Sequence, residues 1–112
     1  MYRDFLARIF SSVQSLERCV AENRRMYNEQ RDQPLAVANT LRDHERMVTQ
    51  MRRAANRLQF EFARSDWNDV NRSIQIFYGL TCMVRPEIMS TYAALANNQI
   101  CLEFVRSDVV CH

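Results

Sequence analysis

Five arginines follow one another along a single predicted helix. They are spaced by 4, 7, 4 and 7 residues, which keeps them on one side of a helix with 3.6 residues per turn: Arg42, Arg46, Arg53, Arg57 and Arg64. The row is roughly 33 Å long at a rise of about 1.5 Å per residue. The planar guanidinium group donates paired hydrogen bonds to phosphate oxygens. The row therefore predicts a surface that binds the phosphates of a nucleic acid.

Polar side chains accompany this row. Thr49 and Gln50 lie near the same side of the helix and suit the 2′-hydroxyl groups of RNA. In A-form RNA these hydroxyls and the phosphates line an accessible minor groove, whereas the major groove is deep and narrow. A rigid helix lying along the duplex would reach both kinds of group without entering a groove. We therefore expect recognition of duplex shape and not of base sequence.

A plain solvated helix face is the competing interpretation of the same arginines. Such faces carry charges that pair with one another, and Asp43, Glu45 and Glu61 are available partners. Of these acids, only Asp43 shares the face of the row. Arg24 and Arg52 are expected beside the helix–helix seam, where each would pair with an acid. The sequence alone leaves both interpretations of the row open.

The periodicity predicts an all-α fold in one domain spanning residues 1–112. Long helices are expected over residues 2–31 and 35–64, and shorter ones over 66–83 and 86–106, with Pro34 and Pro86 opening helices and Ser65 acting as an N-cap. The two long helices should form an antiparallel hairpin. Because a monomer would leave the ends of this hairpin uncovered, we expect a homodimeric helical bundle.

Each predicted helix carries one apolar row with steps of mostly three and four residues, which should form the core. In the first helix the row is Leu6, Ile9, Val13, Leu16, Val20, Asn23 and Tyr27. In the second it is Leu41, His44, Val48, Met51, Ala55, Leu58 and Phe62. In the last two it is Trp67, Val70, Ile74, Phe77 and Thr81, then Ile88, Tyr92, Leu95 and Leu102. The third helix is apolar nearly all round, which predicts burial on more than one side.

No catalytic or metal-binding pattern is present, so we expect a protein that is not an enzyme and has no cofactor. His44 lies on an apolar row and should be a hydrogen-bonded seam residue, and Trp67 a core or interface anchor. The cysteines form no C-x-x-C pair; Cys19, Cys82 and Cys101 should pack as small apolar groups. No stretch approaches the roughly 18 apolar residues of a membrane span.

The start of the second long helix resembles the central helix of the nodavirus RNA-silencing suppressors. Pro34, Val37, Leu41 and Arg57 match that family at the residue level, and residues 47–57 match its polar and basic pattern. The family members are small, helical, dimeric viral proteins that coat double-stranded RNA and keep it from Dicer. The resemblance covers about 30 residues and ends before Trp67, where the apolar helices of this chain depart from the family. The chain has 15 arginines and no lysine, which fits either an overlapping reading frame or selection against ubiquitin attachment.

We therefore expect a double-stranded RNA-binding suppressor of host RNA silencing, with a Dicer-type nuclease as a further potential partner. The sequence opens with no signal-peptide pattern, which favours the host cytosol; the first dozen residues faintly resemble a mitochondrial presequence, so mitochondrial association is the alternative location. The alternative function is a helical protein–protein interaction module, an adaptor or secreted effector that binds no nucleic acid. The sequence does not decide between an RNA and a DNA duplex, or between a dimer and a higher oligomer.

Overall fold

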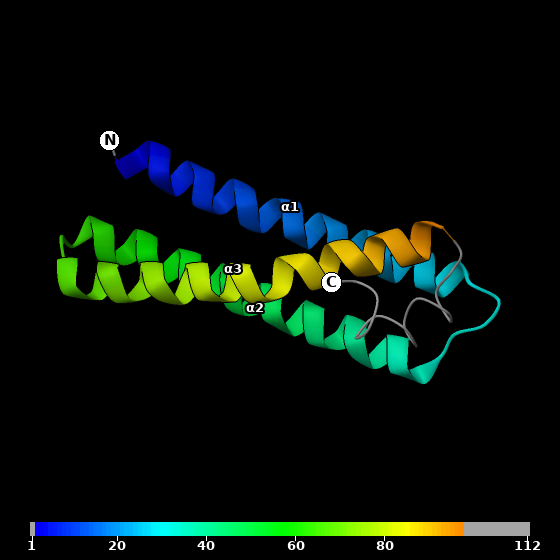
Figure 1. Cartoon of the computed structure of the whole chain (residues 1–112). Helices are drawn as coiled ribbons and strands as arrows, with labels where there is room; N and C mark the ends of the chain where they lie inside the picture. The colour runs from blue at the N-terminus through cyan, green and yellow to red at the C-terminus, as the bar shows by residue number, and fades with distance from the viewer. Residues whose placement is uncertain (1, 98–112) are drawn as a thin grey trace.

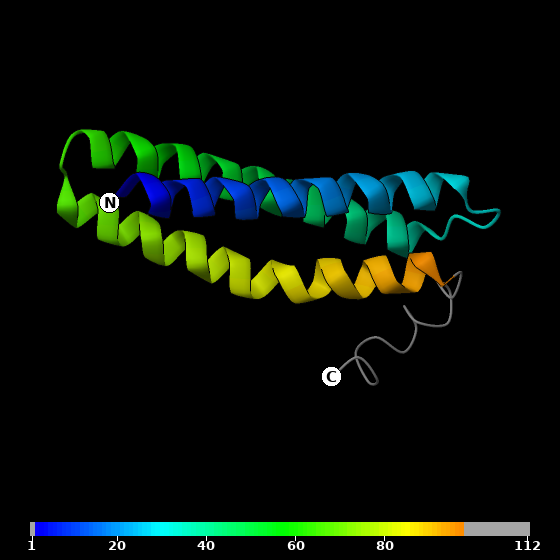
Figure 2. The ribbon, with the colours of Figure 1, turned by 90° about the horizontal axis from the view of Figure 1, so that it is seen from above.

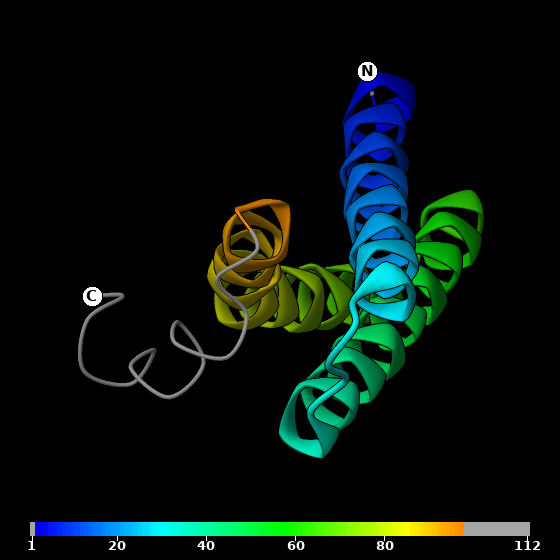
Figure 3. The ribbon, with the colours of Figure 1, turned by 90° about the vertical axis from the view of Figure 1, so that its right-hand side faces the viewer.

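Three long helices account for nearly all of the computed structural model, which describes residues 2–97. They are α1 (Tyr2–Glu29), α2 (Leu35–Ala63) and α3 (Trp67–Ala96), and the described residues contain no strand. The all-α class is confirmed. The helices run up, down and up along one elongated body, so that α1 and α3 point the same way (Figure 1). Seen along the long axis, they cross at an angle and do not lie in one layer (Figure 3).

The core lies where the apolar rows of α1 and α2 meet α3. All seven residues of the predicted α1 row are buried. The predicted α2 row is also buried up to Leu58, but Phe62 is only partly buried and Glu61 is buried in its place. Phe62 instead joins an aromatic group at the end of the bundle, where its ring stacks on Tyr2 at 5.3 Å and meets the edge of Trp67 at 5.8 Å. Aromatic packing there holds the first turn of α1 against the start of α3.

The predicted break between a third and a fourth helix is wrong, because α3 continues through Pro86. Proline removes one backbone hydrogen bond and crowds the preceding turn, which usually ends or bends a helix. Here Val84 and Ile88 are fully buried on either side of it, and Leu95 is buried further on, so apolar packing keeps the helix continuous. Figure 2 shows α3 bending in its yellow stretch, as expected of an internal proline. Residues 98–106 of the predicted fourth helix, including Leu102, lie outside the described residues, as do Cys101 and Cys111.

The turn from α2 to α3 differs from the predicted Ser65 N-cap. Asp66 occupies the N-cap position, and Ser65 has a φ of 55°, in the left-handed region. The amide of Asp66 donates to the carbonyl of Glu61 at 3.0 Å, and the amide of Ser65 donates to the carbonyl of Phe62 at 3.1 Å. This pair of bonds is a Schellman motif, which satisfies the last carbonyls of α2 and favours glycine where Ser65 stands.

The outer face of α3 is exposed, although the sequence predicted burial on several sides. Trp67 is 56% exposed and Tyr92 40%, so neither is the core residue that the apolar rows predicted. Cys82 is exposed too, which contradicts its predicted packing, whereas Cys19 is partly buried and burial raises the pKa of its thiol. With only two neighbouring helices to pack against, a helix buries one side; here that side holds Val70 and Phe77. None of the described helices is long and apolar enough to cross a membrane.

Candidate nucleic-acid interface

The arginine ridge, defined as Arg42, Arg46, Arg53, Arg57 and Arg64, lies on the side of α2 that faces away from its buried row. All five residues are exposed, and α2 carries four of them without a break. Arg64 follows at the C-cap with α-helical backbone angles, φ −93° and ψ −2°, so the ridge keeps its direction to its last member. One rigid element therefore positions all five guanidinium groups.

Four members of the ridge have no carboxylate partner among the described residues: Arg42, Arg46, Arg53 and Arg64. Arg57 has only a weak one, since its Nε lies 4.0 Å from Oε2 of Glu61 and its side chain is 74% exposed. The Glu61 carboxylate is itself buried and accepts a hydrogen bond from the Ser73 hydroxyl of α3. Its attachment to α3 leaves Arg57 mostly free to meet a solvent-side anion.

Arg64 rests on an aromatic ring. Its guanidinium carbon lies 5.3 Å from the centre of the exposed Phe60 ring. A cation–π contact of this kind fixes the direction of the group without neutralising its charge. Phe60 was not among the residues predicted for the site, although its position four residues before Arg64 was an available signal.

The two polar residues predicted beside the ridge are exposed in the structure. The Thr49 hydroxyl donates to the carbonyl of Glu45 at 2.9 Å, which leaves its oxygen lone pairs as acceptors. Gln50 presents its amide on the same part of the helix. Asp43, the one acid expected on this face, is exposed and forms no ion pair within residues 2–97. The surface is therefore rich in donors and poor in negative charge.

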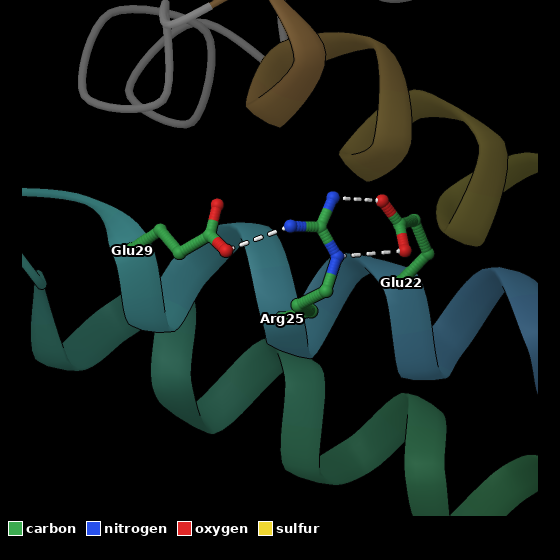
Figure 4. Close-up of polar contacts among 3 residues, drawn as sticks. All are labelled: Glu22, Arg25 and Glu29. Atoms are coloured by element: carbon green, nitrogen blue, oxygen red, sulfur yellow. Dashed lines mark hydrogen bonds and ion pairs between the residues drawn. The ribbon is translucent and has the colours of Figure 1, made fainter.

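One group on the outer face of α1 shows the opposite arrangement. Arg25 lies between Glu22 and Glu29, and it pairs with Glu22 through two nitrogens and with Glu29 at 2.7 Å (Figure 4). These hydrogen bonds raise the pKa of Arg25 and lower the pKa of Glu22. We call this group the Arg25 clamp. Its net charge is negative, so it offers no site for a phosphate.

The two arginines expected beside the seam form the predicted ion pairs. Nε of Arg24 donates to Glu45 at 3.0 Å and its second nitrogen donates at 2.9 Å, while Arg52 binds Glu17 in the same two-pronged way. In each case the hydrogen bonds to the carboxylate raise the pKa of the arginine. Both pairs bridge α1 and α2. The Arg24 pair also removes Glu45 from the reach of the ridge.

His44 is the buried seam residue that the sequence predicted. Its ring is 1% exposed, and Nε2 lies 3.3 Å from a carboxylate oxygen of Glu87 on α3. Burial lowers the pKa of His44, and the Glu87 carboxylate opposes that shift. Nδ1 has no hydrogen-bond partner among the described residues. The geometry is that of a packed, mainly neutral histidine under the surface.

Comparisons of the chain with protein-family models, curated proteins and solved structures find no match. The resemblance to the nodavirus suppressors therefore stays a prediction that depends on the residues quoted above. Within residues 2–97, no cluster of three or more His, Cys, Asp or Glu side chains is placed to hold a metal ion.

Proposed function

We propose that this chain binds double-stranded RNA through the arginine ridge and recognises duplex shape independently of sequence. The observation that carries the proposal is the run of exposed arginines along α2 and its C-cap, four of them without a carboxylate partner in the described part of the chain. Phosphates would accept hydrogen bonds from the guanidinium groups, while Thr49 and Gln50 would meet 2′-hydroxyls. The protein would act by occupancy and not by catalysis.

Suppression of host RNA silencing is the biological role that the family resemblance implies for a protein that covers double-stranded RNA. A duplex whose phosphates are covered by protein is inaccessible to a Dicer-type nuclease. In this proposal the protein is viral, works in the host cytoplasm and acts as a homodimer, because a second copy doubles the contacts along one duplex. Direct contact with the nuclease would be a separate activity, and a mitochondrial location is the alternative to the cytosol.

A random-sequence RNA duplex and its single strands, titrated with the purified protein between about 50 and 200 mM salt, test the proposal. We expect binding that requires the duplex and weakens steeply with salt. Equal binding to duplexes of unrelated sequence is expected too, and a strong preference for one sequence would contradict shape recognition.

The second candidate is a helical interaction module that binds another protein. The exposed apolar side chains of α3, among them Ile76, Met83 and Met89, favour it. Absence of duplex binding at low salt, together with a stable complex with another protein, would select this candidate.

A further inference from the structure

The outer face of α3 combines two features that the fold of one chain does not explain. From Ser73 to Val84 the sequence contains no charged residue, yet Ile76, Tyr78 and Met83 are each about half exposed. At the centre of this stretch stands Gly79, the single glycine of the chain. A glycine inside a helix is destabilising relative to alanine, and a Cβ added at Gly79 would meet nothing within 4 Å. Packing within one chain therefore does not require a glycine at position 79.

Exposed side chains on both sides of Gly79 are arranged symmetrically. On the side nearer α2 lie Arg72, Ile76, Met83 and Glu87, spaced by 4, 7 and 4 residues. This spacing is the same in both directions along the helix, and its centre falls between Gly79 and Leu80. The outermost members, Arg72 and Glu87, carry opposite charges. A second copy running in the opposite direction would therefore place its Glu87 against Arg72.

The opposite edge of the exposed face has an aromatic pair centred on the same point. Trp67 and Tyr92 are the exposed rings that the apolar rows predicted to be buried. Their spacing of 25 residues, close to seven turns, aligns the two rings, and the step of nine residues from Trp67 to Ile76, about two and a half turns, puts them opposite the first stripe. The midpoint between them again falls between Gly79 and Leu80.

We propose that a second copy of this chain docks on the outer face of α3, antiparallel and two-fold about this midpoint. Ile76 then packs on Met83 of the second copy, Trp67 meets its Tyr92, and Arg72 pairs with its Glu87. Gly79 lies at the crossing point, where the absence of a side chain lets the two backbones approach closely.

Charge complementarity supports a second copy over another partner. In one chain Arg72 has only Asp69 at 3.8 Å, and both the Arg72 and Glu87 side chains are mostly exposed, at 74% and 63%. The facing stretch is about 38 Å long at 1.5 Å per residue, which implies an interface on the order of 1,200 Å² in total. That size is at the low end of specific interfaces, so the dimer should depend on protein concentration.

The pairing also sets where the two ridges lie. Glu87 touches His44 of α2, whereas Arg85 donates to Ser12 of α1 at 3.0 Å, so α2 and α1 flank opposite sides of the α3 face. The two-fold axis keeps both α2 helices on one side of the dimer. The pairing itself does not require RNA; its use as a shared duplex footprint rests on the proposed function.

Sedimentation equilibrium of the full chain without RNA, from about 1 to 100 µM, tests the interface. We expect a wild-type dimer whose dissociation constant rises at least about tenfold in Arg72→Glu and in Glu87→Arg, and returns to within about threefold of wild type in the double variant. Gly79→Leu should weaken the dimer while its helical circular dichroism stays at the wild-type level. A ridge variant, Arg53→Ala, should leave the dimer unchanged, so loss of RNA binding and loss of dimerisation are separable.

Cross-linking tests the register independently of stability. In a background with the native cysteines replaced by serine, Ile76→Cys chains mixed with Met83→Cys chains should form disulfide-linked dimers, whereas either chain alone should not. A monomeric wild type over the whole concentration range would overturn the proposal. So would a dimer that tolerates both Gly79→Leu and Arg72→Glu, or cross-links that form equally without mixing.

Discussion

The arginine ridge of α2 and the Arg25 clamp of α1 contain the same side chain in opposite electrostatic states. Arg25 has a glutamate three residues before it and another four residues after it, and it pairs with both. Arg53 has Thr49, Gln50, Asn56 and Arg57 at the equivalent positions, with no acid among them. Local spacing therefore decides whether an exposed arginine is neutralised by its own helix or is free for a ligand.

Packing between helices reinforces this difference. Glu45 lies three residues after Arg42 and could pair with it, but the two-pronged contact with Arg24 holds it at the α1–α2 seam. Glu61 lies four residues after Arg57, but it is buried against Ser73. These two acids of α2 are thus held by side chains of α1 and α3, and the ridge keeps its charge. The same tertiary contacts that build the bundle leave its basic surface unpaired.

Removing most of the ridge should have the largest effect. We expect the variant with Arg42, Arg46, Arg53 and Arg57 all replaced by alanine to bind duplex RNA at least about a hundredfold more weakly. The slope of log affinity against log salt should fall by about three to four. Fluorescence anisotropy at several salt concentrations measures both quantities. An unchanged slope would show that phosphates are bound elsewhere.

Removing the two carboxylates of the Arg25 clamp should give α1 a free arginine like those of the ridge. In Glu22→Gln/Glu29→Gln, Arg25 loses both carboxylates and becomes free to bind phosphate, so duplex affinity should rise severalfold and up to about tenfold. The matched control is Asp4→Asn/Asp32→Asn, which removes two exposed acids without freeing an arginine. Equal gains in both variants would mean that only net charge matters.

The C-terminal end of the ridge is fixed by the left-handed turn at Ser65. Ser65→Gly should stabilise the fold by about 1 kcal/mol, because glycine adopts a positive φ without steric cost. Urea unfolding monitored by circular dichroism gives the change, and duplex affinity should stay the same. A loss of stability would argue against the turn described above.

The buried His44, at the seam between the helices, should give a smaller effect, which is a dependence of the folding stability on pH. Because burial lowers the pKa of His44 below its ordinary value, the unfolded chain binds a proton there more readily than the folded chain does. Stability is therefore intact above about pH 6.5 and decreases as pH falls below that value. His44→Gln should reduce this decrease in the urea midpoint. A midpoint that rises on acidification in a His44-dependent way would mean that the Glu87 contact outweighs burial.

The sequence predicted the parts of this molecule that depend on helical periodicity. The buried row of α1, the buried His44 and the pairing of Arg24 and Arg52 with an acid beside the seam follow from steps of three and four residues, and the structure confirms them. The exposure of the arginine ridge follows from the same steps, although its role stays a prediction.

The errors arise where tertiary packing overrides a local signal. Pro86 normally starts or ends a helix, but buried Val84 and Ile88 hold α3 together across it. Trp67 and Tyr92 are large and apolar, yet a third helix with only two neighbours must leave one face uncovered. Glu61 could not be predicted as buried, because its partner Ser73 belongs to another helix.

The most direct test compares two single arginine variants that change the net charge equally. Arg53→Ala removes a free member of the ridge, and Arg25→Ala removes the centre of the clamp. We predict that Arg53→Ala weakens duplex RNA binding for all sequences alike and lowers the salt slope by about one, while Arg25→Ala leaves that slope unchanged. Equal losses in the two variants, or no loss in Arg53→Ala, would contradict the ridge as the duplex-binding surface.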